Sequence, residues 1–311
     1  MTDNQSTSGQ SEIRRRESDR QKTRAKEEEL KILPQRRPGW YISGAFILLL
    51  TAWAALGFSN NSNIDFPVIG EYFLKPVILG GVMNTLVMAA LATVCALIIG
   101  TILAVMRLSG GPVWAAFSWT YVWFFRSVPL LVLIIFAGNL TLLAPRLGIS
   151  VPFTGFSLVS VPTNVIMTAF VASVVAISLH AGAHTAEIIR GGILSVPNGQ
   201  REAVKALAIP ALRAFFLVTL PQAMRIIIPP IGTTIISTVL ATSLVSVVAG
   251  SELMTRVEDI SATNLKTMEL LIVACLWYLI ISSALGLAQY FIERKYGRGY
   301  SRTTPVTDSS V

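Results

Sequence analysis

Six long apolar runs, separated by polar segments, constrain this chain more than any other feature of its sequence. A helix needs about 20 mainly apolar residues to cross the hydrocarbon core of a bilayer. Hydrophobic residues make up 53% of the chain and charged residues only 14%, a composition typical of membrane proteins. The sequence therefore predicts an all-α integral membrane protein with six transmembrane helices. They are expected at residues 42–58, 81–106, 126–143, 164–183, 226–249 and 268–291.

The cysteines and the overall charge narrow the class of protein further. Cys95 and Cys275 both lie inside apolar runs, so neither a disulfide framework nor a cysteine metal site is predicted. The formal net charge of +8 indicates basic cytoplasmic segments of a membrane protein rather than binding to nucleic acid. The chain carries no GxxxxGK(S/T) sequence, so ATP-driven work would need a separate nucleotide-binding chain.

Polar segments lie at both ends of the chain. Residues 1–38 have too few apolar side chains to order themselves and are expected to form a disordered, basic cytoplasmic tail. The alternative is a helix over residues 12–33 that contacts anionic lipid or a partner. Because such a long polar region precedes it, the run at 42–58 is expected to be an N-terminal transmembrane helix, not a cleaved signal peptide. Residues 294–311 are expected to form a second cytoplasmic tail.

The distribution of basic residues predicts the orientation in the membrane. With six spans and the N-terminus in the cytoplasm, both termini and the long segment between the fourth and fifth spans face inward. Of the 25 Lys and Arg residues, only Lys75, Arg146, Arg256 and Lys266 then lie outside. Basic residues concentrate in cytoplasmic loops, so this orientation in the plasma membrane is strongly favoured.

The segment between the fourth and fifth spans is charged yet helix-forming. Pro197, Asn198 and Gly199 predict a turn, and residues 200–208 favour a helix. A second short helix is expected over residues 211–220, closed before Pro221. Two short helices at an angle, held between membrane spans, are a docking element for a cytosolic partner.

The sequence of this segment resembles the EAA loop of ABC importer permeases, in the variant found in permeases for polar amino acids and opines. The sequences SVPNGQREAVKAL and TLPQAMRIIIPP carry the resemblance, and Glu202, Ala203, Leu220 and Pro221 match the family consensus. Ala208 replaces a family glycine. If that glycine serves a positive φ, alanine would cost about 1–2 kcal/mol there.

The resemblance implies a type I ABC importer permease: a five-helix core over residues 80–293 with coupling loop 187–225, plus one extra N-terminal helix. It implies a transport subunit, not an enzyme, with no cofactor in this chain. Its expected partners are a pair of ATP-binding subunits that hold ATP and Mg, a second permease subunit (identical or paralogous), an extracytoplasmic solute-binding protein and membrane lipid. The solute would be a polar amino acid such as glutamate, glutamine, arginine or histidine. The expected ATPase-coupling residues are Gly199, Gln200, Glu202, Ala203, Ala208, Leu220 and Pro221.

Several polar residues in or beside the spans are candidates for the solute path. For Asn84 the alternative is a capping or interhelical hydrogen bond, and for Arg126 it is a side chain that reaches to the membrane interface. Hydroxyls within a span usually bond to a carbonyl one turn back, which is the alternative for Thr242 and Ser243. The candidate path residues are Asn84, Thr85, Arg126, Pro129, His180, His184, Thr242 and Ser243.

Two other functions compete with the importer. His180, His184 and Glu187 share one helix face and could hold a metal, as in a membrane metalloenzyme, but no fourth ligand or HExxH pattern accompanies them. We therefore expect a structural or pore-facing role and predict no metal site. An ion-driven secondary transporter would need carboxylates in the middle of its spans, and none of the six predicted spans has one at its centre.

Overall fold

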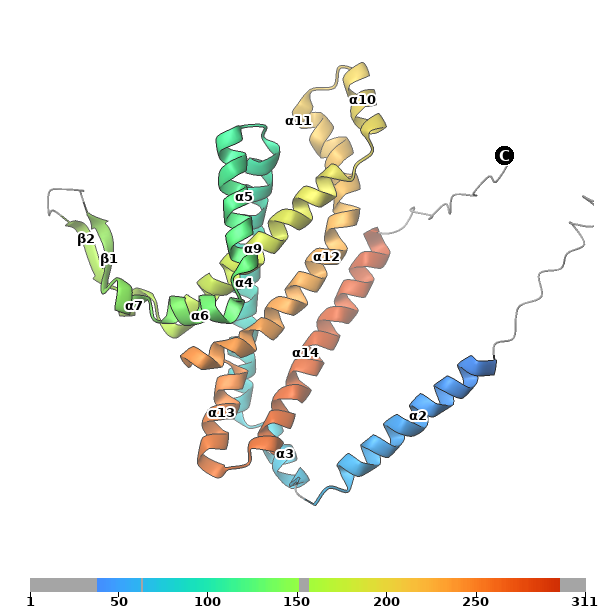
Figure 1. Ribbon diagram of the computed structural model, residues 1–311, viewed down its shortest axis with the longest axis vertical. Helices are drawn as coiled ribbons and strands as arrows, with labels where there is room; N and C mark the ends of the chain where they lie inside the picture. The colour runs from blue at the N-terminus through green and yellow to red at the C-terminus, as the bar shows by residue number, and fades with distance from the viewer. Residues whose placement is uncertain (1–37, 63, 151–156, 297–311) are drawn as a thin grey trace, which may run out of the picture. The chain divides into compact units, whose positions relative to one another are not determined.

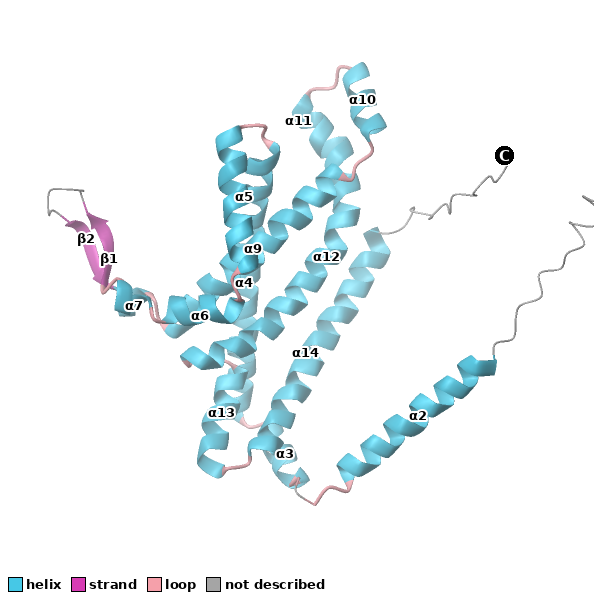
Figure 2. Cartoon of the chain, viewed as in Figure 1, coloured by secondary structure: helices cyan, strands magenta, loops and turns pink. Residues whose placement is uncertain are grey.

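The computed structural model describes residues 38–62, 64–150 and 157–296 (Figure 1). Residues 1–37 and 297–311 hold nearly all of the two expected tails and lie outside the described residues, as does the alternative helix at 12–33. The chain divides into two units, Met1–Asn63 and Ile64–Val311. Figure 2 shows that helices dominate and that the described strands form a single hairpin.

The first unit contributes one described helix, α2 (Pro38–Ser59). Its side chains are apolar on every side, and those of Phe46, Leu48, Leu49 and Trp53 are all more than half exposed. A helix that is hydrophobic all round suits a lipid environment rather than water. α2 covers the expected N-terminal span.

The second unit carries the remaining helices and the hairpin. Four of its described helical stretches are long and apolar enough to cross a membrane, and a bent pair of helices would make a fifth. Together with α2 this agrees with the all-α membrane fold. The bounds are α3 (Phe66–Phe73), α4 (Pro76–Leu108), α5 (Pro112–Ser127), α6 (Leu130–Gly138), α7 (Leu140–Leu143), β1 (Arg146–Ser150), β2 (Ser157–Pro162), α8 (Thr163–Ile166), α9 (Ala169–Leu194), α10 (Asn198–Ala206), α11 (Ala211–Ala214), α12 (Leu220–Ala241), α13 (Leu253–Asn264) and α14 (Thr267–Tyr296).

α4 is the central helix of the unit because two apolar clusters share it. One cluster joins α4 to α13 and α14 through Ile78, Leu253 and Leu270, all fully buried. The other joins α4 to α6 and α9 through Met88, Ile134 and residues near the middle of α9. Proline occupies the first position of α4 and α5, where its missing N–H costs no helical hydrogen bond.

The expected third span, residues 126–143, is not one helix. α5 ends at Ser127, α6 begins at Leu130, and the two helices are bent by 96°. Val128 is extended (φ −86°, ψ 129°), as the steric demands of the following Pro129 require. The aromatic segment before Arg126 therefore belongs to the helix, and the chain turns where we expected it to continue.

Residues 144–163, which separate the expected third and fourth spans, contain the antiparallel hairpin of β1 and β2. Leu147 pairs with Val161, and Arg146 pairs with Pro162. The Arg146 Nε donates to Ser160 Oγ at 2.8 Å across the hairpin. The polar segment after the fifth span likewise contains a helix, α13, which the apolar pattern did not predict.

The segment expected to be the coupling loop is shorter than predicted because the helices on both sides run into it. α9 continues to Leu194, past the expected start of the loop at residue 187. Residues 211–241 form one continuous helical rod, so the helix does not close before Pro221. A π-helical turn, Phe215–Thr219, precedes that proline and widens the rod where the ring would otherwise meet the carbonyl of Leu217.

Candidate functional site

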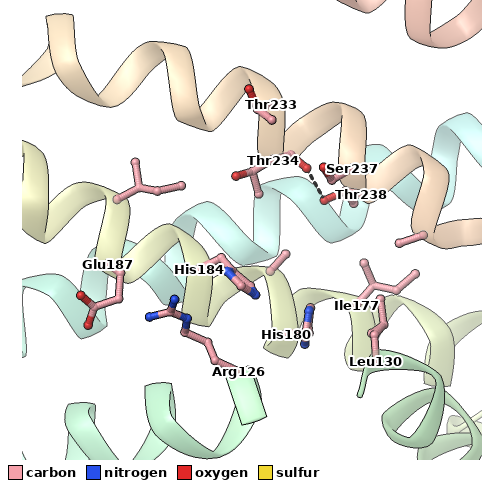
Figure 3. A pocket seen from close by; sticks show the side chains of 13 residues that line it. Arg126, Leu130, Ile177, His180, His184, Glu187, Thr233, Thr234, Ser237 and Thr238 are labelled. Atoms are coloured by element: carbon pink, nitrogen blue, oxygen red, sulfur yellow. Dashed lines mark hydrogen bonds between the residues drawn. The ribbon is translucent and has the colours of Figure 1, made fainter. Parts of the chain in front are cut away.

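A cavity of about 500 Å³ opens between α9, α12 and the junction of α5 with α6 (Figure 3). Its apolar wall includes Leu130 and Ile177. The rest of the lining is polar, with contributions from three separate elements. The polar side chains are Arg126, His180, His184, Glu187, Thr233, Thr234, Ser237 and Thr238.

Arg126 reaches the cavity from the last turn of α5. The break at Pro129 turns the chain away immediately afterwards, so the arginine stands at a helix end beside α9. Figure 3 shows its guanidinium group directed toward His184 and Glu187. Within the described part of the chain, Arg126 forms no ion pair and no hydrogen bond of its own, whereas five other basic residues do form ion pairs. Its positive charge is therefore available to a solute.

α9 presents His180, His184 and Glu187 on one face, as their spacing predicts. The two imidazole rings lie with their centroids 5.0 Å apart. The Glu187 carboxylate is engaged by arginines: Arg190 Nη2 donates to Oε2 at 2.7 Å, and Arg107 Nη1 lies 3.7 Å from Oε1. No described group of three His, Cys, Asp or Glu residues could hold a metal ion. The histidines therefore line the cavity without a third ligand beside them.

α12 supplies the hydroxyl wall of the cavity, which our sequence prediction missed. Thr234 Oγ1 donates to the Pro230 carbonyl and Thr238 Oγ1 to the Thr234 carbonyl, both at 2.9 Å. Their protons are used within the helix, so their oxygens face the cavity as acceptors. The spacing of Thr233, Thr234, Ser237 and Thr238 repeats at one helical turn, and that repeat is visible in the sequence.

The other predicted path residues do not line this cavity. Asn84 Nδ2 donates to the Ser251 carbonyl at 2.9 Å, and the Leu253 N–H donates to Thr85 Oγ1 at 3.1 Å. These bonds fasten α4 to the start of α13. The hydroxyls of Thr242 and Ser243 bond to carbonyls three residues earlier, and Pro129 sets the break between α5 and α6. Of the eight candidates, Arg126, His180 and His184 are brought together.

A second cavity, of about 430 Å³, lies against the first on the side of α4 and α5. It shares Arg126, His184 and Glu187 with the first cavity and adds Arg107 from the end of α4. Trp119 and Trp123 form another part of its wall, with nearly parallel rings 6.2 Å apart. The shared residues form a polar partition between the two spaces.

Five of the seven expected coupling residues lie on a knuckle formed by α10, α11 and the turn between them, at the opposite end of the second unit from α13 (Figure 1). Gly199, Gln200, Glu202, Ala203 and Ala208 are exposed there. Arg201 Nη2 donates to the Ile193 carbonyl at 2.9 Å and so ties α10 to the end of α9. Leu220 and Pro221, in contrast, lie in the first turn of α12.

The turn between α10 and α11 has the backbone geometry that the replaced glycine would serve. Ala208 has φ +49°, in the left-handed region that favours glycine. The Ile209 N–H still donates to the Val204 carbonyl at 3.1 Å and closes the end of α10. The turn is therefore formed with alanine in place of glycine, with local strain of about 1–2 kcal/mol.

Comparison with known proteins identifies the family. Residues 96–298 match the family of binding-protein-dependent transport system inner membrane components. The arginine transport system permease protein ArgU of Corynebacterium glutamicum is 36% identical over 271 residues, 87% of this chain and 84% of that protein. The L-cystine transport system permease protein TcyB of Bacillus subtilis is 36% identical over 72% of this chain and 88% of its own length. The glutamine transport system permease protein GlnP of Escherichia coli is 29% identical over 71% and 93%.

Solved structures agree with this assignment. A chain of an amino acid ABC transporter crystallised with histidines superposes with a TM-score of 0.63 at 25% identity, over 75% of this chain and 99% of that one. A chain of the inward-facing methionine transporter MetNI shares the fold, with a TM-score of 0.57 at 18% identity over 72% and 97%. This chain is thus a multi-pass membrane protein of the binding-protein-dependent transport inner membrane component family, a permease subunit of ABC transporters and not an enzyme.

Proposed function

We propose that this chain is the permease subunit of an ATP-driven importer for a polar amino acid, with the cavity between α9 and α12 on the solute's path. The observation that carries the proposal is Arg126, which has no ion pair among the described residues and lies at the wall of the cavity. The rest of the lining consists of hydroxyls, imidazoles, apolar side chains and the Glu187 carboxylate, which Arg107 and Arg190 already hold. The relatives named for arginine, cystine and glutamine transport support an amino acid as the solute.

The cavity offers a partner to each group that amino acids have in common. A guanidinium group matches a carboxylate with two parallel hydrogen bonds, so Arg126 is suited to the α-carboxylate. The hydroxyl oxygens of Thr234 and Ser237 on the opposite wall can accept hydrogen bonds from the α-ammonium group. A volume of about 500 Å³ lies within the usual range for small-molecule sites.

The cost of Arg126 in a membrane segment also supports a hydrated path. A charged side chain surrounded by lipid is expensive, and arginines in spans therefore face water or a partner charge. Arg126 lines both cavities, so water or solute in either one can solvate it. This arrangement favours a solute contact over a side chain that only reaches to the membrane interface.

Coupling to ATP would pass through the knuckle. ATP and Mg would be held by a pair of ATP-binding subunits that contact α10, while an extracytoplasmic binding protein delivers solute on the other side. A second permease subunit would complete the path. Because Arg201 ties α10 to α9, and α9 carries His180 and His184, movement of the knuckle reaches the cavity through one rigid helix. Such a motion is a two-state switch biased by nucleotide.

Uptake into proteoliposomes that contain the complete complex tests the proposal. Arg126→Gln is expected to lower amino acid uptake by at least about tenfold, since hydrogen bonds to charged groups contribute roughly 1.5–3 kcal/mol. Arg126→Lys keeps the charge and is expected to retain part of the activity. The matched control is Arg256→Gln, because Arg256 is on α13 and does not line the cavity. Full uptake by Arg126→Gln, or uptake driven by an ion gradient without ATP, would contradict the proposal.

A further inference from the structure

Positively charged side chains outnumber negatively charged ones around the cavity. Glu187 is its one acidic side chain among the described lining residues, and it is held by Arg190 on one oxygen and Arg107 on the other. Arg126 adds a third guanidinium group on the same side. Three arginines therefore surround a single carboxylate, and the carboxylate has no oxygen left without an arginine beside it.

The other elements that line the cavity do not restore the balance. α12 contributes hydroxyl groups, and α9 contributes the two imidazoles beside Glu187. Glu252 lies outside the cavity lining, and its carboxylate caps α13 through hydrogen bonds from Met254 and Thr255. A cationic group entering this space would meet like charges and no free carboxylate.

We propose, on the basis of the importer function above, that the cavity selects amino acids by side-chain charge: neutral polar and acidic side chains are accepted, and cationic side chains are rejected. With Arg126 bound to the α-carboxylate, a side-chain carboxylate or amide can accept hydrogen bonds from Arg107, which lines the adjoining cavity. A side-chain guanidinium or ammonium would have to displace Arg107 or Arg190 from Glu187, and like-charge contacts are strongly unfavourable. This chain would then differ in its solute from the Corynebacterium glutamicum relative that is named for arginine transport.

The test measures binding to the purified permease–ATPase complex without the binding protein, which would impose a selection of its own. A ligand that binds the folded state and not the unfolded state stabilises it by RT ln(1 + [L]/Kd), so the unfolding temperature rises with ligand concentration by an amount that depends on Kd. Titrations with glutamate, glutamine, arginine and lysine then give an apparent affinity for each. We expect glutamate and glutamine to bind at least about tenfold more tightly than arginine or lysine.

The double variant Arg107→Gln/Arg190→Gln provides the sharper test because it releases the Glu187 carboxylate. Its preference is expected to shift toward arginine by roughly tenfold, with a matching loss for glutamate. Arg107→Gln alone is the milder variant and should shift the preference in the same direction. Arg256→Gln, which removes an arginine outside the cavity, should leave the order of affinities unchanged.

The outcomes separate the charge rule from the importer proposal. If arginine binds the unmodified complex as tightly as glutamate, or if both Arg107 variants leave the preference unchanged, the charge rule is wrong and the amino acid cavity stands. If none of the four amino acids raises the unfolding temperature, the cavity is not an amino acid site, and both proposals fall.

Discussion

Gly100 of α4 faces Thr185 of α9 so closely that a methyl group on Gly100 would lie 2.5 Å from the Thr185 Cγ2. Three residues before Thr185 on α9, a methyl group on Gly182 would lie 2.9 Å from Ile99 Cγ2 of α4. Small residues at such crossings let membrane helices approach at backbone distance. Thr185 directly follows His184, so the tight crossing fixes the helix that lines the cavity.

Gly100→Ala should therefore loosen the crossing. Because the Thr185 side chain and the neighbouring backbone have little room to move, we expect a destabilisation of about 1–3 kcal/mol. The unfolding midpoint of the detergent-solubilised protein measures it. Gly80→Ala is the matched control in the same helix, since a methyl group there would meet no atom within 4 Å. Equal midpoints for the two variants would show that the crossing is not tight.

Ala208→Gly should relieve strain in the knuckle. The relief of a positive φ exceeds the extra unfolded-chain entropy of glycine, and we expect a gain of about 0.5–1 kcal/mol. Hydrogen–deuterium exchange of the α10 amides measures this local stability. In Ala208→Gly their exchange should slow by up to roughly fivefold. Ala206→Gly, two residues earlier and within α10, should have the opposite effect. Faster exchange in Ala208→Gly would argue against strain at this position.

The sequence predicts the parts of this fold that depend on local pattern. Apolar runs locate the helices because each must satisfy its own backbone within the bilayer. The order of residues around Glu202 and Leu220 indicates the family, which the comparisons confirm, and predicts the coupling loop. The position of the missing glycine even anticipates the left-handed turn at Ala208. In each case the information lies within a single stretch of chain.

Features that depend on contacts between distant residues were not predicted. The partners Arg107 and Glu187 are 80 positions apart, and each is unremarkable within its own helix. The hydroxyl face of α12 becomes a cavity wall only because α9 packs opposite to it. The turn at Pro129 is visible in the sequence as a proline, but a proline in an apolar run can either kink a helix or end it. The 96° bend depends on the packing of α6.

Glu202→Lys is expected to abolish uptake while the protein still inserts into the membrane. Glu202 is exposed on α10 and forms no ion pair in the described part of the chain, so its carboxylate is free to bind a basic residue of the ATPase. Reversal of its charge would turn this attraction into repulsion. Co-purification of the ATPase and uptake together measure the effect. Asp259→Lys, the same kind of reversal on α13, should retain the ATPase. Normal uptake by Glu202→Lys would rule out this role.

Cysteine labelling tests the orientation that the knuckle requires. α10 and α13 lie at opposite ends of the second unit (Figure 1), and the distribution of basic residues predicts that α10 faces the cytoplasm. In a background with Cys95 and Cys275 replaced by serine, a membrane-impermeant maleimide should label Gln200→Cys only in inside-out vesicles. Asp259→Cys, on α13, should be labelled only in right-side-out vesicles. An ATPase reaches a knuckle only from the cytoplasm, so labelling of Gln200→Cys from the outer side alone would refute ATP-driven coupling through this loop.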